Sequence, residues 1–363
     1  MIMGSNIFDF STVTGPFHEW LLENLSPGLT MTIEWTIIGL VLILFAALSV
    51  MAMVYMERKV AAFFQLRLGP MRVGPWGMFQ VVADFLKLLM KEHIMNKTAD
   101  SFLFNLAPFI IVIAAFLGLG TIPFALGMHV FDINIGIFFI TAASSIGVLG
   151  ILLGGWAANN KYSLIGALRS GAQVVSYELS VTLSLLVIVV FTGSLQLSTI
   201  VESQADGWRI FKGHFVVWIA FIIYLIAGTA ETNRGPFDLA EAESELTAGF
   251  HTEYSGIKFA MFFLAEYVNL FIIASIGATM FLGGWMPFHI GVEGFDNIMD
   301  YIPSIIWFFG KVFFIILIIM WFKWTFPRLR IDQILILEWK YLLPINLVNL
   351  ILTALVVLNG WHF

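Results

Sequence analysis

Cysteine is absent from all 363 residues, and charged residues are scarce, at 12% of the chain. The first absence excludes disulfides, thiolate metal sites and cysteine-held iron–sulfur clusters within this chain. The second goes with 60% hydrophobic residues and a mean hydropathy of +0.92. Soluble domains carry about 25% charged residues, so this composition indicates a polytopic α-helical membrane protein instead.

Other classes of protein are excluded by what is missing. The net charge is −6, so no basic surface for a nucleic-acid partner is predicted. Disorder does not fit 36 Phe and 12 Trp residues. The seven histidines offer no pair at helical ligand spacing, and neither a dinucleotide fingerprint nor a nucleophile motif is present. We therefore expect no metal and no cofactor bound by this chain.

Apolar stretches long enough to cross about 30 Å of hydrocarbon recur along the whole chain. Eight are predicted, near residues 33–56, 102–122, 135–155, 172–195, 213–230, 259–283, 304–326 and 341–359. The fold class expected is an all-α polytopic membrane protein with additional interfacial amphipathic helices. Residues 1–363 form a single membrane domain in this interpretation, with residues 1–31 as an outer N-terminal segment.

The distribution of positive charge predicts the orientation. Fifteen of the 18 Lys and Arg residues follow spans 1, 3, 5 and 7, whereas only Arg209 and Lys212 lie in the opposite connections. Because cytoplasmic loops carry the excess of Lys and Arg, both termini are predicted to lie on the outer side. The eighteenth cation, Lys311, falls inside span 7.

The inner connection 57–100 is predicted to contain a helix at 76–92. At about 100° per residue, four polar side chains form one narrow stripe, and apolar side chains cover the rest. The stripe consists of Gln80, Asp84, Lys87 and Lys91. This pattern is typical of an amphipathic helix packed on protein or lipid headgroups, although a solvated surface helix is an open alternative.

The inner connection 231–258 is unusually acidic. It holds Glu231, Asp238, Glu241, Glu243, Glu245 and Glu253 against two cations, Arg234 and Lys258. On a helix, Asp238, Glu241 and Glu245 would share one face while Glu243 points away. Crowded carboxylates do not all ionise easily, so some are expected to hold protons near neutral pH. An ordinary exposed charge run is the alternative, but the interleaved Phe237, Leu239, Leu246 and Phe250 favour a loop that folds back and buries itself.

Three carboxyl groups are predicted at similar depth near the inner boundary. Glu178 lies about six residues into span 4, Glu266 lies about eight residues into span 6, and Glu231 closes span 5. Ionisable groups within a membrane are costly and usually face a polar pathway. The alternative is one structural, hydrogen-bonded carboxyl per helix.

Long motifs in the chain resemble one membrane component of respiratory NADH–quinone oxidoreductases (complex I), the family called NADH dehydrogenase subunit one in mitochondria. The resemblance rests on MERKVAAFFQLRLGPMRVGPWGMFQVVADFLKLLMKE at 56–92, GWAANNKYSLIGALRSGAQVVSYELS at 155–180, AETNRGPFDLAEAESELTAGFHTEYSGIKFAMFFLAEYVNL at 230–270, and PRLRIDQILILEWKYLLP at 327–344. It covers nearly all of the chain after residue 31.

The resemblance implies eight transmembrane helices and a place for this chain at the membrane floor of a quinone chamber. It implies that Arg58 and Phe263 lie at the quinone entrance, that Asp84 and Arg234 line the inner chamber, and that Arg169 lies beside it. An acidic path to proton-translocating subunits is implied for Glu178, Glu231, Asp238, Glu241, Glu243, Glu245, Glu253 and Glu266, with Lys311 as a buried cation near that path.

The resemblance also implies the cofactors and partners. Quinone is the substrate of the complex, and FMN and iron–sulfur clusters lie in partner subunits. The partners implied are the quinone-site and terminal iron–sulfur subunits of the peripheral arm, neighbouring small membrane subunits, and lipids. The location implied is the bacterial cell inner membrane.

Three alternative functions are kept open by the sequence. The nearest is the equivalent subunit of a membrane-bound hydrogenase-type complex, which neighbouring reading frames would reveal. A stand-alone proton-coupled transporter would show inverted repeats and broken helices, which the sequence does not indicate. A passive anchor would tolerate loss of its buried acids without any change in proton pumping.

Overall fold

The computed structural model describes residues 11–240, 243–289 and 293–360 of the chain. All regular structure in these ranges is helical, and eight helical segments are long and apolar enough to cross a membrane. They are α2 (Pro27–Phe64), α4 (Ser101–Gly120), α5 (Gly136–Ala157), α6 (Lys161–Thr192), α9 (His214–Glu231), α11 (Gly256–Phe281), α13 (Ser304–Thr325) and the segment Ile331–Leu358. The prediction of eight spans is therefore confirmed.

The last spanning segment is not one uniform α-helix. It runs through α14 (Ile331–Ile336), a π-helical turn (Leu337–Leu342) and α15 (Leu343–Leu358). A π-helical turn has one residue more per turn than the α-helix on either side of it, and such turns are found frequently at functional sites.

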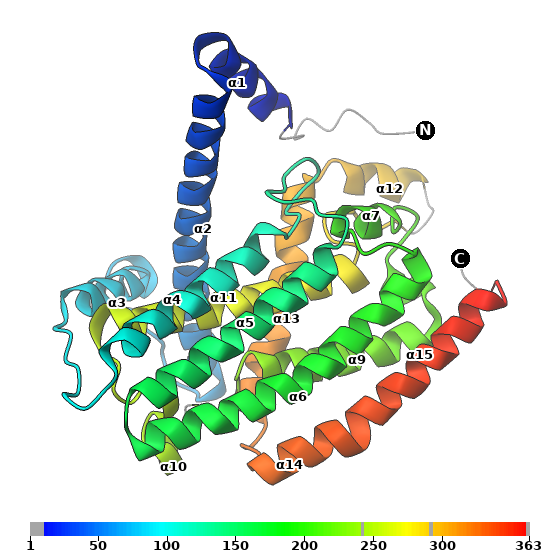
Figure 1. Cartoon of the computed structure of the whole chain (residues 1–363). Helices are drawn as coiled ribbons and strands as arrows, with labels where there is room; N and C mark the ends of the chain where they lie inside the picture. The colour runs from blue at the N-terminus through cyan, green and yellow to red at the C-terminus, as the bar shows by residue number, and fades with distance from the viewer. Residues whose placement is uncertain (1–10, 241–242, 290–292, 361–363) are drawn as a thin grey trace.

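Shorter helices connect the spanning segments. They are α1 (Ser11–Asn24), α3 (Phe79–Met90), α7 (Leu197–Glu202), α8 (Arg209–Lys212), α10 (Glu243–Leu246) and α12 (Glu293–Asp300). The amphipathic helix predicted at 76–92 is confirmed as α3, which is preceded by a 3₁₀ turn at Pro75–Gly77. Figure 1 shows α3 at an angle to α2 rather than alongside it.

Two predicted helix starts are wrong by about three turns. Span 4 was expected from residue 172, but α6 begins at Lys161, where the Asn160 side chain accepts a hydrogen bond from the Tyr162 backbone N–H. Span 8 was expected from residue 341, but helix begins at Ile331. In both cases polar residues in the first turns lowered the local hydropathy, although the backbone was already helical.

Helix α11 lies at the centre of the bundle. It packs against α2, α3, α4, α9 and α13, and its residues from Leu270 to Phe281 are buried. Small residues allow close approach between neighbouring helices: a Cβ on Gly150 of α5 would lie 2.2 Å from Ile111 Cγ1 of α4. The C-terminal half of α11, which carries no charged residue after Glu266, fits this buried position.

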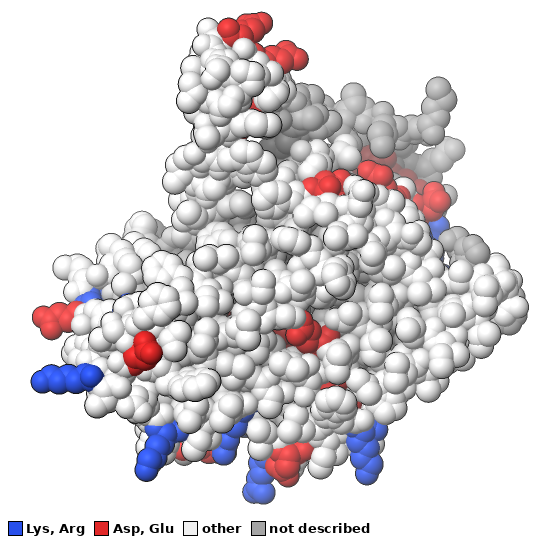
Figure 2. All heavy atoms as spheres, in the orientation of Figure 1, with Lys and Arg blue, Asp and Glu red and all other residues white. Residues whose placement is uncertain are grey.

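Helix α2 differs from the others because its N-terminal half stands clear of the bundle, with α1 folded over its tip (Figure 1). The two helices are joined by a contact between His18 Nδ1 and Glu34 Oε1 at 2.6 Å. Figure 2 shows most Lys and Arg of this face along its lower and left edges, near α3, α10 and α14, below a largely uncharged surface that a few acidic side chains interrupt.

Candidate functional site: a buried ion cluster between two cavities

The first component of the site is a buried cluster of polar and ionised side chains, which we call the central ion cluster: Glu57, Arg234, Glu266, Tyr267 and Lys323. Arg234 Nη1 lies 2.5 Å from Glu57 Oε2, and Arg234 Nε lies 3.1 Å from Glu266 Oε1. Lys323 Nζ lies 2.5 Å from the other Glu57 oxygen. The Tyr267 hydroxyl donates to Glu57 Oε2 at 2.7 Å, and its ring centroid lies 4.1 Å from the Arg234 guanidinium carbon.

Four separate elements supply this cluster. Glu57 comes from the last third of α2, Glu266 and Tyr267 come from α11, and Lys323 comes from the end of α13. Arg234 lies in the turn that follows α9. That turn is fixed by Gln173 of α6, whose side-chain nitrogen donates to Ala230 O and Phe237 O, both at 2.7 Å.

The charges of the central ion cluster are matched, with two carboxylates against two cations. Burial alone would lower the pKa of the Arg234 guanidinium, but the Glu266 and Glu57 carboxylates outweigh it and hold that pKa well above its usual value. Arg234 therefore stays positively charged at every pH the protein meets. A buried ion pair costs desolvation energy, and loss of one partner leaves an uncompensated charge.

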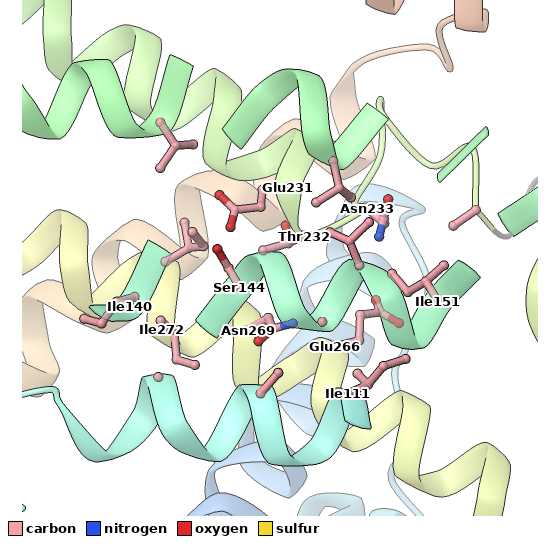
Figure 3. Close-up of a pocket in the computed structure, with 18 of the residues that line it drawn as sticks. Ile111, Ile140, Ser144, Ile151, Glu231, Thr232, Asn233, Glu266, Asn269 and Ile272 are labelled. Atoms are coloured by element: carbon pink, nitrogen blue, oxygen red, sulfur yellow. The ribbon is translucent and has the colours of Figure 1, made fainter. Parts of the chain in front are cut away.

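The second component is a cavity of about 80 Å³ between α4, α5, α6, α9 and α11, which we call the inner acid cavity. Glu231, Glu266, Ser144 and Asn269 line it together with apolar side chains such as Ile111. Figure 3 shows the Ser144 hydroxyl pointing toward the Glu231 carboxyl, with Asn269 and Glu266 projecting from α11 toward the same space.

Glu178 adjoins this cavity from α6. Its carboxyl accepts hydrogen bonds from Ser145 and, at 3.3 Å, from Ser144, and it lies close enough to Glu231 for the two acids to repel each other. The structure thus brings together the three acids that the sequence predicted at similar depth. Glu178 and Glu231 are linked through Ser144 of α5, which the sequence analysis did not single out.

The third component is a larger cavity of about 240 Å³ between α2, α3 and α11, which we call the lateral cavity. Arg58, Asp84 and Phe263 line it, and Arg58 Nη1 lies 2.5 Å from Asp84 Oδ2. The predicted polar stripe of α3 is partly engaged here, because Gln80 donates to the other Asp84 oxygen at 3.2 Å. The other walls of the lateral cavity are mainly apolar.

Direct contacts connect the lateral cavity to the inner acid cavity. The Phe263 ring lies 4.7 Å from the Tyr267 ring, centroid to centroid. Tyr267 belongs to the central ion cluster, and Glu266 of the same cluster lines the inner acid cavity. A continuous series of contacts, from Phe263 to Tyr267, from Tyr267 to Arg234 and from Arg234 to Glu266, therefore runs from the lateral cavity to the inner acid cavity.

The acidic loop, residues 231–258, packs onto the bundle through its apolar side chains, as predicted. The buried side chains are Phe237, Leu239, Leu246 and Phe250. Its acids are separately engaged in the pairs Asp238–Arg328 at 2.7 Å, Glu245–Arg169 at 2.6 Å and Glu253–Asn160 at 2.7 Å. The expectation of one shared helical face is wrong for Asp238, because Asp238 is not in a helix, and the next helical residue that the structure describes is Glu243. Glu241 lies outside the described residues.

Lys311 lies apart from these acids. Its ammonium donates to Gly284 O at 2.8 Å and Met286 O at 2.6 Å, and it lies 4.2 Å from the centroid of the Trp208 ring. This position is near the start of α13, whereas Lys323 of the central ion cluster lies near its end. Of these two lysines, Lys323 contacts a carboxylate of the central ion cluster, that of Glu57, while Arg234 is the cation beside Glu266.

Two buried acids, Glu57 and Glu338, and the half-buried Lys323 escaped the sequence analysis. Glu57 and Lys323 fell at predicted span ends, where charges are ordinary, and Glu338 fell just outside the predicted eighth span. The available signal for Glu57 was its position within the predicted interfacial region, next to Arg58. In the part of the chain that the structure describes, no group of three His, Cys, Asp or Glu side chains could hold a metal ion.

Comparison with known proteins gives one consistent result. Residues 37–354 match the family model described as NADH dehydrogenase. The chain is 60% identical to the H component of the NADH-quinone oxidoreductase of Bacteroides fragilis, and 61% identical to the protein of the same name from Bacteroides thetaiotaomicron, over 98% of this chain and 100% of each relative. It is 47% identical to the corresponding protein of Brevibacillus brevis, over 90% of this chain and 94% of that relative.

Proposed function

The chain belongs to the NADH dehydrogenase family and is a membrane subunit of NADH-quinone oxidoreductase, and from this premise we propose that it forms the membrane side of the quinone-binding chamber. The observation that carries the proposal is the line of contacts from Phe263 in the lateral cavity through Tyr267 and Arg234 to Glu266 in the inner acid cavity. The contacts thus connect the lateral cavity, which suits an apolar ligand, with the carboxyl groups of the inner acid cavity, which can bind and release protons.

In this proposal quinone enters from the bilayer between α2, α3 and α11. Its polyprenyl tail lies along apolar side chains such as Phe63 and Phe263, and Arg58 and Asp84 flank the route of the headgroup. A lateral cavity of about 240 Å³ bounded mainly by apolar walls, with the Arg58–Asp84 pair and Lys87 as its charged groups, fits an amphipathic ligand with a long tail. FMN and iron–sulfur clusters held by partner subunits would supply the electrons, since this chain offers no cysteine to hold such a cluster.

Reduction of quinone creates negative charge or a demand for protons beside the central ion cluster. Arg234 stays positive, so a change of charge in the chamber acts on the carboxyls paired with it, Glu57 and Glu266. Glu266 faces the same cavity as Glu231, which adjoins Glu178. We propose that protonation changes pass along this series and, with the loop acids Asp238, Glu243, Glu245 and Glu253, couple quinone reduction to proton translocation.

The charge distribution supports an orientation with both termini outside and the acidic loop on the inner side of a bacterial inner membrane. On that inner side the chain would meet the quinone-site and terminal iron–sulfur subunits of the peripheral arm. Neighbouring membrane subunits and lipid would cover its apolar sides.

A photoreactive azidoquinone added to membranes containing the whole complex tests the chamber. Labelled peptides from this chain are expected to include those carrying Arg58, Asp84 or Phe263, and excess quinone should suppress the labelling. The F263A variant should label less and show a quinone KM raised several-fold, because about one aromatic side chain of buried apolar contact is lost. Labelling confined to other subunits, with an unaltered KM in F263A, would contradict the proposal.

A further inference from the structure

A line of buried polar side chains runs between α6 and the last spanning segment, on the side of α6 that faces away from the inner acid cavity. We call it the polar seam: Ser176, Ser180 and Ser184 on α6, and Glu338, Asn346, Asn349 and Thr353 on the facing segment. The α6 serines recur every fourth residue, so they share one face. Glu178 lies two residues from Ser176 and Ser180, about 200° around the helix, and faces α5 instead.

Glu338 is the one acid in the polar seam, and its side chain is fully buried. Ser180 Oγ donates to Glu338 Oε1 at 2.5 Å. The second carboxyl oxygen, Oε2, is also buried and accepts no hydrogen bond within the described residues. Glu338 lies in the π-helical turn Leu337–Leu342, the one departure from α-helical geometry in this spanning segment.

No cation faces Glu338 from the described elements packed around it. From α6 the nearby titratable group is Tyr177, whose hydroxyl donates to Ile334 O at 3.0 Å. From α9 the charged side chain at this end is Glu231, which lines the inner acid cavity on the other side of α6. On its own segment, Asp332 and Lys340 are exposed. Among the described residues, Glu338 therefore has one hydroxyl donor and no counter-ion.

A carboxylate buried in this way is costly, because an isolated charge in a low-dielectric interior gains nothing that replaces its hydration. The charge of the Glu57 carboxylate is balanced by Arg234 and Lys323. Among the described residues, no arginine or lysine balances a charge on Glu338 in this way. The remaining way to remove the charge is to keep a proton on the carboxyl. A hydrogen-bonded acid of this kind within a membrane helix marks a route for protons more often than a structural contact.

We propose that Glu338 is a proton-binding site, separate from the inner acid cavity, that holds a proton at neutral pH and exchanges it when the complex turns over. On release, the proton passes from Oε2 to a water molecule in the polar seam, and the carboxylate left behind keeps the hydrogen bond from Ser180. From Glu338 to Thr353 the seam covers about 22 Å along the helix, so its hydroxyl and amide groups can order water over most of the bilayer. This proposal uses the turnover of the parent complex as its trigger but does not depend on where quinone binds.

Electrochemically induced infrared difference spectra of the intact complex test the proposal, because a protonated carboxyl has a C=O band well separated from that of a carboxylate. We expect a redox-dependent carboxylic acid band that is lost in Glu338→Gln. In proteoliposomes the same variant should transport fewer protons per quinone reduced than wild type. Glu202→Gln, which changes an exposed acid on α7, is the matched control and should alter neither quantity.

Difference spectra of E338Q that match wild type, together with an unchanged ratio of protons to quinone, would overturn the proposal and leave Glu338 a structural group. If E338Q does not assemble, Ser180→Ala keeps the carboxyl and removes its donor. The carboxylic acid band should then move to higher frequency, and an unmoved band would overturn the proposal equally. These results are independent of the quinone labelling pattern, so failure here and failure of the proposed chamber are distinguishable.

Discussion

At the scale of single residues, Glu57 has the most demanding position in the molecule. Each of its oxygens lies 2.5 Å from a different cation, and Tyr267 donates to it as well. Removing one partner from a buried ion pair typically costs about 3–5 kcal/mol. The central ion cluster therefore depends on Glu57 for its charge balance and its geometry.

We expect E57Q to lower the quinone reductase rate of the assembled complex by about ten-fold or more, since about 1.4 kcal/mol reaching the transition state has that effect. The neutral amide cannot compensate Arg234 and Lys323 together. Steady-state assays on membranes, normalised to assembled complex, provide the measurement, with E202Q as control. A rate for E57Q equal to wild type would show that the cluster is dispensable for quinone reduction.

Arg234 gives a prediction about pH. The carboxylates of Glu266 and Glu57 keep the pKa of its guanidinium well above the usual value despite burial, so Arg234 does not lose its proton in the accessible range. Its contribution to activity and stability is fully present at neutral pH and would be lost only as pH rises through that high pKa.

In R234K the ammonium has a lower intrinsic pKa, about 10.4, than the guanidinium, so in the same surroundings it loses its charge at a lower pH. We therefore expect R234K to be partly active near pH 7 and to lose activity on the alkaline side, where wild type shows no decline due to this group. A pH series of quinone reduction rates tests this. Parallel wild-type and R234K profiles would argue against a charge requirement at this position.

At the scale of elements, the turn before α3 controls how that helix meets α2. Gly77 has a φ of +80°, and a Cβ there would lie 2.2 Å from Pro70 O. Val81 and Asp84 of α3 line the lateral cavity, so a displaced turn moves the cavity wall. Gly193, at the end of α6, has a similar φ of +67° but open space around it.

We expect G77A to raise the KM for quinone several-fold while leaving the protons transported per quinone unchanged. G193A carries a comparable backbone strain, about 1 kcal/mol, without the collision, and should keep a KM within about two-fold of wild type. Quinone titrations of both variants distinguish the effect of the Cβ collision at residue 77 from the effect of backbone strain alone. Equal KM values in the two variants would contradict this account of the turn.

Most elements were predictable from the sequence because membrane spans have a strong hydropathy signal. The starts of α6 and of the last spanning segment were not, since residues such as Lys161, Asp332 and Lys340 lower the hydropathy of turns that are nevertheless helical. That error hid Glu338. The pairing of Arg58 with Asp84 and the assembly of the central ion cluster depend on tertiary packing of several elements, which no local pattern contains.

At the scale of the whole molecule, the described part of the chain is an apolar bundle in which three groups of polar side chains bear on the proposals: the central ion cluster, the inner acid cavity and the polar seam. The sequence predicted the acids Glu178, Glu231 and Glu266 and their depth, and the structure supplies the serines and cations that join them. Family membership decides against a hydrogenase-type protein and a stand-alone transporter. A passive membrane anchor is the remaining rival to an active role in coupling.

Proton transport by the intact complex carrying Glu231→Gln, reconstituted in liposomes, distinguishes a coupling role from an anchoring one most directly. Glu231 lines the inner acid cavity and adjoins Glu178, and a glutamine keeps its size while removing its ability to bind and release a proton. We predict that E231Q assembles normally and that its proton transport falls several-fold below that of wild type and of the E202Q control. Wild-type proton transport and quinone reduction in fully assembled E231Q would contradict the account.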